Sequence, residues 1–221
     1  MITVHHLNNS RSQRVLWLLE ELGVPYEVKR YERNARTMLA PPELRAIHPL
    51  GKSPVIEENG VVTAETGAII EQIMAEHPGN ALTPPSGSAA ARRVTYWLHY
   101  AEGSAMTPLL LKLVFGALPK RSPGLVKPLV NAISKKAQSS FIDPQIADHT
   151  AFWEGELSRA AWFAGDQFTA ADIMMSFPLE ACSSRAPFGP DKPRCAAFLK
   201  TIHARPAYQR ALERGGPYAY A

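Results

Sequence analysis

Residues 5–28 read HHLNNSRSQRVLWLLEELGVPYEV and predict a strand, a turn, a helix and a second strand. Apolar side chains recur at positions 15, 16, 18, 19 and 22, which is the spacing of one helix face. Gly23 stands where that helix is expected to end, and Pro25 prevents its continuation. The stretch therefore predicts a right-handed parallel βαβ unit.

The same kind of alternation continues to about residue 80. Residues 41–47 predict a short helix, and two apolar runs around Asn59-Gly60 predict a β-hairpin. Residues 66–77 again have helical spacing. The order β-α-β-α-β-β-α predicts a mixed four-stranded sheet with helices on its faces.

A linker rich in Pro, Gly and Ser occupies residues 78–88, and no convincing strand pattern follows it. The long apolar run that follows predicts a helix with a kink at Pro108, and helical spacing continues beyond it. We therefore expect two domains, at residues 1–80 and 88–221, with the second an all-α bundle. Thr169 and Asp172 form a capping box at the start of one helix in this bundle.

Composition narrows the function classes. The chain has 221 residues, 46% hydrophobic and 20% charged, with a formal net charge of +4. No run of about 18 apolar residues and no secretory signal pattern is present, so we expect no membrane span and a cytoplasmic location. Cys182 and Cys195 are isolated, and His and Cys do not cluster at metal spacing, so we expect reduced thiols and no metal. The basic stretch at 120–136 lacks aromatic residues, which argues against nucleic-acid binding.

Ser10 lies three residues before Gln13, which is the spacing of a capping box at the start of the first helix. A helix start also attracts anions, because its N–H groups are unpaired and the dipole is positive there. A hydroxyl that accepts one backbone hydrogen bond can still donate another. Ser10 can therefore act as a cap and as a donor to an anion.

Four motifs in this order resemble the cytosolic glutathione transferases. They are residues 5–28, quoted above, then APPELRAIHPLGKSPVIEENG at 40–60, AETGAII at 64–70 and GDQFTAADI at 165–173. The closest resemblance is to their serine-type fungal and bacterial branch. It implies a thioredoxin-like N-terminal domain, glutathione as co-substrate and a homodimer with two-fold symmetry.

The resemblance implies that Ser10 is the catalytic donor to the glutathione sulfur, because it stands four residues before the basic Arg14 of the first helix turn. A free thiol has a pKa of about 8.5, so a donor or positive potential is needed to form the nucleophilic thiolate. Asn9, whose amide also donates, is the main alternative. Ser12 is a third candidate, which we expect to face solvent. No Tyr stands in the first strand and no Cys near residue 10, which argues against the tyrosine-type and cysteine-type classes.

The glutathione-binding residues implied by the resemblance are Lys52, Ser53, Pro54, Glu65 and Thr66. Pro54 would be a cis-proline that turns the backbone of Ser53 towards the cysteinyl group, or alternatively an ordinary trans-proline at an edge strand. Lys52 would bind the glycyl carboxylate, or be a surface lysine. Thr66 would take the γ-glutamyl carboxylate and Glu65 the ammonium, or Thr66 would be a plain N-cap.

The electrophile would bind against the first helix of the second domain, where Tyr96, His99, Tyr100 and Met106 recur at helical spacing. Aromatic residues at this spacing are more often core. Glu102 would be a solvated glutamate, or would reach the glutathione ammonium across a dimer interface.

These observations predict a glutathione transferase that activates the thiol for attack on electrophilic, mostly apolar substrates, with possible hydroperoxide reduction. One alternative is a non-catalytic glutathione-binding or regulatory protein of the same fold, because fold does not dictate function. A weaker one is an interaction domain linked to a translation factor or synthetase. We expect no nucleic-acid or membrane partner.

Overall fold

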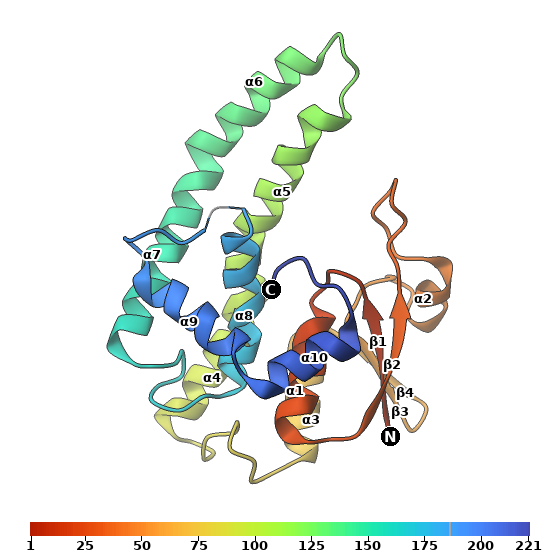
Figure 1. The fold of residues 1–221 in the computed structure, drawn as a ribbon, viewed down its shortest axis with the longest axis vertical. Coiled ribbons are helices and arrows are strands. Elements are labelled where there is room, and N and C mark those ends of the chain that lie inside the picture. The colour runs from red at the N-terminus through yellow and green to blue at the C-terminus, as the bar shows by residue number, and fades with distance from the viewer. Residues whose placement is uncertain (186) are drawn as a thin grey trace.

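The computed structural model describes residues 1–185 and 187–221. The N-terminal half forms a four-stranded sheet with the spatial order β2-β1-β3-β4 (Figure 1). β1 (Ile2–Leu7) is parallel to β2 (Tyr26–Tyr31), whereas β3 (Val55–Glu58) is antiparallel to β1 and to β4 (Val61–Ala64). The predicted mixed four-stranded sheet is confirmed.

The end of the first helix and the turn of the hairpin lie where the sequence predicted them, because the local backbone conformation fixes both. Helix α1 (Ser12–Leu22) ends at Gly23, whose φ of 64° lies in the left-handed region that glycine adopts at little cost. The β3–β4 turn places both Asn59 and Gly60 at positive φ, as the tightest hairpin turns require.

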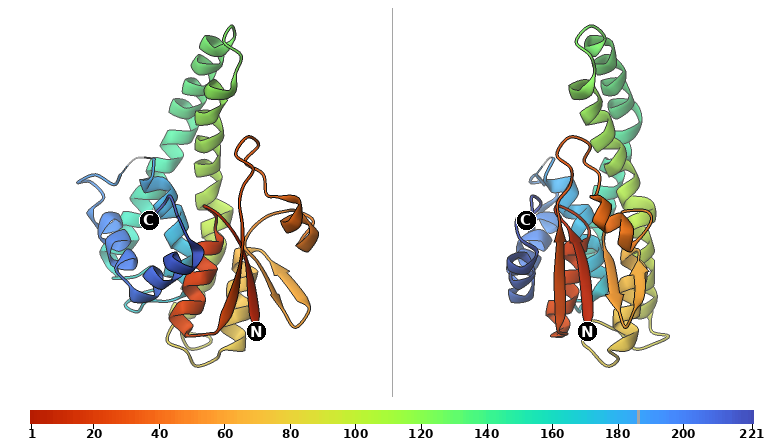
Figure 2. Two further views of the ribbon diagram at one scale, coloured as in Figure 1. Left: turned by 45° about the vertical axis from the view of Figure 1, so that its right-hand side comes forward. Right: turned by 90° about the vertical axis from the view of Figure 1, so that its right-hand side faces the viewer.

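The sheet lies between helices on its two faces (Figures 1 and 2). α1 and α3 (Thr66–Glu76) lie on the face towards the helical half. The short α2 (Pro42–Ile47) lies on the other face, where Leu44 packs against Leu7 and Tyr31. The ends of β1, α1 and α3 therefore lie on the side of the N-terminal half that faces the helical half.

The second half of the chain is helical. Its elements are α4 (Ala89–Tyr100), the π-helical turn η1 (Ala101–Ala105), α5 (Met106–Arg121), α6 (Lys127–Ala137), the π-helical turn η2 (Gln138–Ile142), α7 (Asp143–Arg159), α8 (Ala170–Ser183), α9 (Pro193–His203) and α10 (Pro206–Gly215). α5 and α6 form a helical hairpin that extends beyond the rest of the molecule (Figures 1 and 2).

α4, η1 and α5 form one helical stretch, Ala89–Arg121, in which Pro108 occupies the first turn of α5. The residue four positions before Pro108 is Ser104, inside η1, so the missing N–H of the proline coincides with the irregular turn. The stretch is long and apolar enough to cross a membrane by length and composition alone. In this structure Trp97 and Leu109 of the stretch are buried in the core, whereas Leu110 is exposed.

α8 is the central helix of this half, and its start is fixed as predicted. Asp172 accepts a hydrogen bond from the backbone N–H of Thr169 at 2.8 Å, and the Thr169 hydroxyl accepts from the N–H of Ala171. This confirms the capping box at Thr169 and Asp172. Asp172 also accepts from the N–H of Phe163, so the box anchors the preceding loop.

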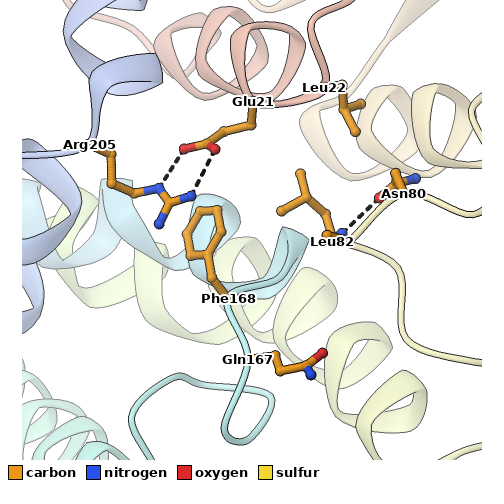
Figure 3. Close-up of a pocket in the computed structure, with 8 residues that line it drawn as sticks. Glu21, Leu22, Asn80, Leu82, Gln167, Phe168 and Arg205 are labelled. Carbon is orange, nitrogen blue, oxygen red and sulfur yellow. Dashed lines mark hydrogen bonds and ion pairs between the residues drawn. The ribbon is translucent and has the colours of Figure 1, made fainter.

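The two halves meet along α1, which packs against α8 and α10. An open hollow of about 480 Å³ lies at this junction, beside the linker (Figure 3). Its two charged side chains neutralise each other: Arg205 donates to Glu21 at 2.6 and 2.8 Å, and its guanidinium lies 3.8 Å from the centre of the Phe168 ring. The ion pair between Glu21 and Arg205 in this hollow therefore links the two halves.

Candidate active site

The turn between β1 and α1 carries Ser10. Asn9 turns the chain with a φ of 49°, and α1 begins at Ser12 with no side chain capping it. The hydroxyl of Ser10 accepts from the backbone N–H of Ser12 at 3.3 Å, whereas the N–H of Gln13 donates to the backbone carbonyl of Ser10. The predicted Ser10–Gln13 capping box is therefore wrong. The amide of Gln13 is buried without a hydrogen-bond partner instead of reaching back to the turn.

The hydroxyl of Ser10 belongs to a buried chain of hydrogen bonds. Its Oγ lies 2.7 Å from Oγ of Ser12, which lies 2.8 Å from Nδ1 of His6. Burial lowers the pKa of His6 to about 4, so its imidazole is neutral near pH 7. The prediction that Ser12 faces solvent is wrong, because its side chain is fully buried.

The segment before β3 closes the other side of Ser10. The Ser53–Pro54 peptide bond is cis, as the resemblance implied. The hydroxyl of Ser53 donates to the carbonyl of His5 at 2.9 Å and accepts from the N–H of Leu7, which ties this segment to β1. Oγ of Ser10 lies 3.4 Å from Oγ of Ser53. The turn that carries Ser10 and the cis-proline segment are thus in direct contact.

The start of α3 joins this assembly through Arg14. Thr66 is buried at the first turn of α3, and its hydroxyl accepts from Nη2 of Arg14 at 3.3 Å. Glu65 precedes it with a φ of 73° and is exposed. The N-cap is therefore Glu65, and Thr66 is the first helical residue. Lys52 is exposed and lines the cleft beside Ser53.

A partly buried ion pair links α1 to the helical half. Arg14 is 1% exposed and donates to Glu102 of η1 at 2.5 Å, and Nε of Arg11 donates to both oxygens of the same carboxylate. Burial alone would raise the pKa of Glu102, but the two guanidinium groups hold it below its usual value. Glu102 is thus paired within its own chain, and the expectation of a solvated glutamate is wrong.

A cleft of about 850 Å³ opens between the two halves and has Ser10 in its lining. One wall comes from the N-terminal half, at Met38, Leu39 and Leu50. The other comes from α5, and its apolar lining residues are Met106, Leu109, Leu110, Leu113, Val114, Ala117 and Leu118. A polar turn therefore adjoins a long apolar surface.

Met106 lines this cleft as predicted, but Tyr96, His99 and Tyr100 do not. Tyr96 and His99 are exposed elsewhere on α4, and the hydroxyl of Tyr100 pairs with His149 at 2.5 Å. The physical reason is η1, because a π-helical turn inserts an extra residue and rotates α5 relative to α4. A helix face of α4 therefore does not continue as the same face of α5.

The C-terminal segment covers the turn. Oδ1 of Asn9 accepts from the backbone N–H of Ala219 at 2.8 Å, and Tyr220 lines the cleft and packs against Phe177. The hydroxyl of Tyr218 donates to the buried carboxylate of Glu180 at 2.7 Å. The carbonyl of the Asn9 side chain is therefore engaged in holding this segment.

Sequence reasoning did not predict the roles of His6, Ser12, Arg14 and Glu102 in this assembly. Arg14 and Glu102 are 88 residues apart, so no local pattern connects them. The sequence feature that could have indicated part of this assembly is the cluster of polar residues at 10–14, directly before a strongly apolar stretch.

Comparison with protein families identifies both halves. Residues 10–75 match the model of the glutathione S-transferase N-terminal domain, and residues 117–206 match that of the C-terminal domain.

Whole-chain relatives agree. Glutathione S-transferase 3 of Schizosaccharomyces pombe is 32% identical over 97% of this chain and 88% of its own length. Glutathione S-transferase 1 of Saccharomyces cerevisiae is 32% identical over 97% of this chain and 95% of its own. A crystal structure of a glutathione S-transferase from Actinobacillus pleuropneumoniae is 33% identical and superposes with a TM-score of 0.78, covering 99% of this chain and 94% of that one.

Proposed function

The chain belongs to the glutathione S-transferase family, and from that premise we propose that Ser10 activates the glutathione sulfur. The protein is a glutathione transferase, and glutathione is its co-substrate. The observation that carries the proposal is the position of the Ser10 residue, which lies two residues before the start of α1, in the lining of the cleft, with its Oγ 3.4 Å from that of Ser53.

The chemistry of the thiol explains why a hydroxyl is needed there. Only a few per cent of a free thiol is ionised at pH 7, and the thiolate is the nucleophile. A hydroxyl that donates to the sulfur and the positive end of α1 both favour the thiolate. This chemistry supports our proposal that the chain belongs to the serine-type branch, with Asn9 as the alternative donor.

The rest of the tripeptide would lie along the segments around Ser10. The cis peptide bond at Pro54 supports pairing of the Ser53 backbone with the cysteinyl group. Exposed Lys52 in the cleft suits the glycyl carboxylate. The start of α3 at Thr66 suits the γ-glutamyl carboxylate, with Glu65 balancing the ammonium.

The experiment is a pH titration of the ultraviolet absorbance of the bound glutathione thiolate. We expect a pKa well below the free value of about 8.5 in the wild-type protein and a return towards that value in Ser10→Ala. Conjugation by Ser10→Ala should fall by at least about tenfold in kcat/KM. An unshifted pKa in the wild-type protein, or an unchanged one in Ser10→Ala, would refute the role of Ser10.

The second substrate would be a small electrophile bound against the apolar wall of α5, in keeping with a role in detoxification and with possible hydroperoxide reduction. Residues 1–80 would form the thioredoxin-like glutathione-binding domain, and residues 88–221 the helical domain that contributes most of this wall. Two buried cysteines, Cys182 and Cys195, are free, which favours a reducing cytoplasmic location.

A two-fold symmetric homodimer is supported by apolar side chains that are exposed just before α6, on α6 and in η2. Leu125 is 96% exposed, Leu129 64%, Ile133 56% and Phe141 61%. Large apolar side chains exposed in number on a protein surface are typical of association surfaces. Light scattering should give twice the chain mass, and Leu129→Asp should yield a monomer. A monomeric wild-type protein at micromolar concentration would exclude the dimer.

A further inference from the structure

Glu180 is a buried carboxylate that the proposed thiol chemistry does not use. It lies in α8 and is 1% exposed. Its Oε1 accepts a hydrogen bond from the hydroxyl of Tyr208 at 2.6 Å and lies 3.1 Å from Nε2 of His203. Its Oε2 accepts from the hydroxyl of Tyr218 at 2.7 Å. A buried carboxylate is costly unless donors surround it, so each of these donors holds its own segment against α8.

The three donors come from different parts of the chain. His203 is the last residue of α9 and Tyr208 lies in the first turn of α10, so both belong to packed helices. Tyr218 belongs to the C-terminal segment, residues 216–221, which runs from the end of α10 back to α8 (Figure 1). Burial raises the pKa of Tyr218, so its hydroxyl keeps the proton that it donates to Glu180. Tyr218 therefore ties a non-helical segment to the helical half.

The C-terminal segment also contacts the cleft. The N–H of Ala219 donates to Oδ1 of Asn9 at 2.8 Å, and Tyr220 lines the cleft. Within the part of the chain that the structure describes, residues 217–221 make two hydrogen bonds, this one and that of the Tyr218 hydroxyl. Because so few bonds hold these residues, their local stability depends strongly on each one.

Tyr218 and Tyr220 contact the same side of α8. The ring of Tyr220 packs edge-on against Phe177, with the ring centres 5.5 Å apart. Phe177 lies three residues before Glu180, so these two residues are neighbours on one face of the helix. The rings of Tyr218 and Tyr220 are themselves 5.3 Å apart. The hydrogen bond that fixes Tyr218 on Glu180 therefore also fixes the place of the Tyr220 ring in the cleft.

We propose that Glu180 and Tyr218 form a latch that positions Tyr220 in the wall of the cleft, and that both are positioning residues for the transferase reaction. The inference rests on the proposed function, because it concerns how the electrophile is received in the same cleft. When the latch is broken, the C-terminal segment leaves the cleft for part of the time. The electrophile then binds only the fraction of molecules in which Tyr220 is in place, and its apparent affinity falls by that fraction.

The latch should not affect the glutathione sulfur. The hydroxyl of Ser10 is held by Ser12 and Ser53, which lie outside the C-terminal segment. We therefore expect the pKa of the bound glutathione thiol to keep its wild-type value when the latch is broken. An effect on the electrophile without an effect on the thiol distinguishes the latch from the role of Ser10.

The first variant is Tyr218→Phe, which removes one hydroxyl and keeps the ring. With chlorodinitrobenzene as the electrophile, its KM should rise by roughly three- to tenfold at unchanged kcat, the effect of one net hydrogen bond. The KM for glutathione and the absorbance titration of the thiolate should match the wild type. Hydrogen exchange of the backbone amides at 218–221 should accelerate.

Tyr208→Phe is the matched control. It removes the other tyrosine hydroxyl that donates to Glu180, and that hydroxyl belongs to α10 and not to the C-terminal segment. Its loss of stability in urea should resemble that of Tyr218→Phe, because each variant leaves Glu180 with one donor fewer. The KM for chlorodinitrobenzene and the exchange at 218–221 should stay at their wild-type values.

Tyr220→Ala tests whether the latch acts through Tyr220. It should raise the KM for chlorodinitrobenzene with Tyr218 intact. In its presence Tyr218→Phe should add little, because the side chain that the latch positions is gone. Effects that multiply in the double variant would show that the two tyrosines act independently and would overturn the inference.

A KM for chlorodinitrobenzene that Tyr218→Phe leaves unchanged would overturn the inference while the proposed function stands. An equal rise in Tyr208→Phe would also overturn it, because the effect would then come from general loosening around Glu180. So would a raised thiol pKa in Tyr218→Phe, because the latch would then act on the sulfur. If the wild-type protein binds glutathione but conjugates no electrophile, the proposed function fails and this inference with it.

Discussion

Oγ of Ser12 lies 2.8 Å from Nδ1 of His6 and 2.7 Å from Oγ of Ser10, so groups from β1, the turn and α1 form one buried hydrogen-bonded chain. Each hydroxyl has a single proton to donate. When Ser12 donates to Ser10, the proton of Ser10 is left for another acceptor, which in this structure is Oγ of Ser53 at 3.4 Å and with glutathione bound would be the sulfur. Ser12 therefore acts as a positioning residue behind Ser10.

The variant Ser12→Ala should raise the pKa of the bound glutathione thiol and lower kcat/KM by roughly three- to tenfold, because a net hydrogen bond contributes about 0.5–1.5 kcal/mol. Absorbance titration of the thiolate measures the first effect. Ser12→Thr, which keeps the hydroxyl, should restore the thiol pKa. A thiol pKa that is unchanged in Ser12→Ala would show that the chain has no influence on the sulfur.

The burial of His6 makes stability depend on pH. Its pKa falls from 6.5 to about 4 in the folded protein, so the folded state resists protonation. The stabilisation is present above pH 6.5 and is lost as the pH falls towards 4, by up to about 3 kcal/mol. His6→Asn, measured by urea unfolding across this range, should lose this component of the pH dependence. Exposed His99→Asn is the control and should retain it.

Parts of the fold were predictable because their causes are local. Gly23, Asn59-Gly60 and the box at Thr169 each act within a few residues, and the structure bears out all three. The Ser10–Gln13 pattern had the same local form and was wrong, since α1 begins two residues beyond Ser10. Its polar side chains are held by tertiary contacts that a sequence pattern does not contain.

The apolar wall was harder to predict than the polar turn. Extrapolation along one helix face from Tyr96 to Met106 assumes 3.6 residues per turn throughout. The π-helical turn η1 breaks that assumption, and it also carries Glu102 to the guanidinium of Arg14. The π-helical turn that makes the extrapolation wrong therefore also provides the contact between the two halves.

That contact should contribute to stability through its buried partner. Glu102→Gln leaves the guanidinium of Arg14, which is 1% exposed, with neutral acceptors only. We expect a loss of about 1–3 kcal/mol in the free energy of unfolding. Arg11→Gln removes a partner that is 34% exposed and should cost less than about 1 kcal/mol. Similar losses in both variants would show that burial of Arg14 is not what matters.

The Glu102 contact should also weaken in acid. Its pKa is held below the usual value by Arg14 and Arg11, so its stabilisation is present above that usual value and is lost as the pH falls below it. The difference between wild type and Glu102→Gln should therefore shrink in acid.

The start of α8 offers a comparison between two caps. Thr169→Ala removes a buried cap and should lower the free energy of unfolding by about 0.5–2 kcal/mol. Ser88, the N-cap of α4, accepts from the N–H of Ala91 at 3.0 Å but is only half-buried. Ser88→Ala should cost less in the same urea titration. A larger loss from Ser88→Ala would contradict the assignment of α8 as the central helix.

Asn9 and Ser10 can be separated by the contact between Asn9 and Ala219. Asn9→Gly suits the positive φ at this position but removes the acceptor for the N–H of Ala219. Hydrogen exchange in residues 217–221 should therefore accelerate in Asn9→Gly and stay slow in Asn9→Asp, which keeps an oxygen there. If Asn9 only holds the C-terminal segment, the thiolate pKa in Asn9→Gly should match the wild type. A rise as large as that in Ser10→Ala would instead make Asn9 the donor to the sulfur.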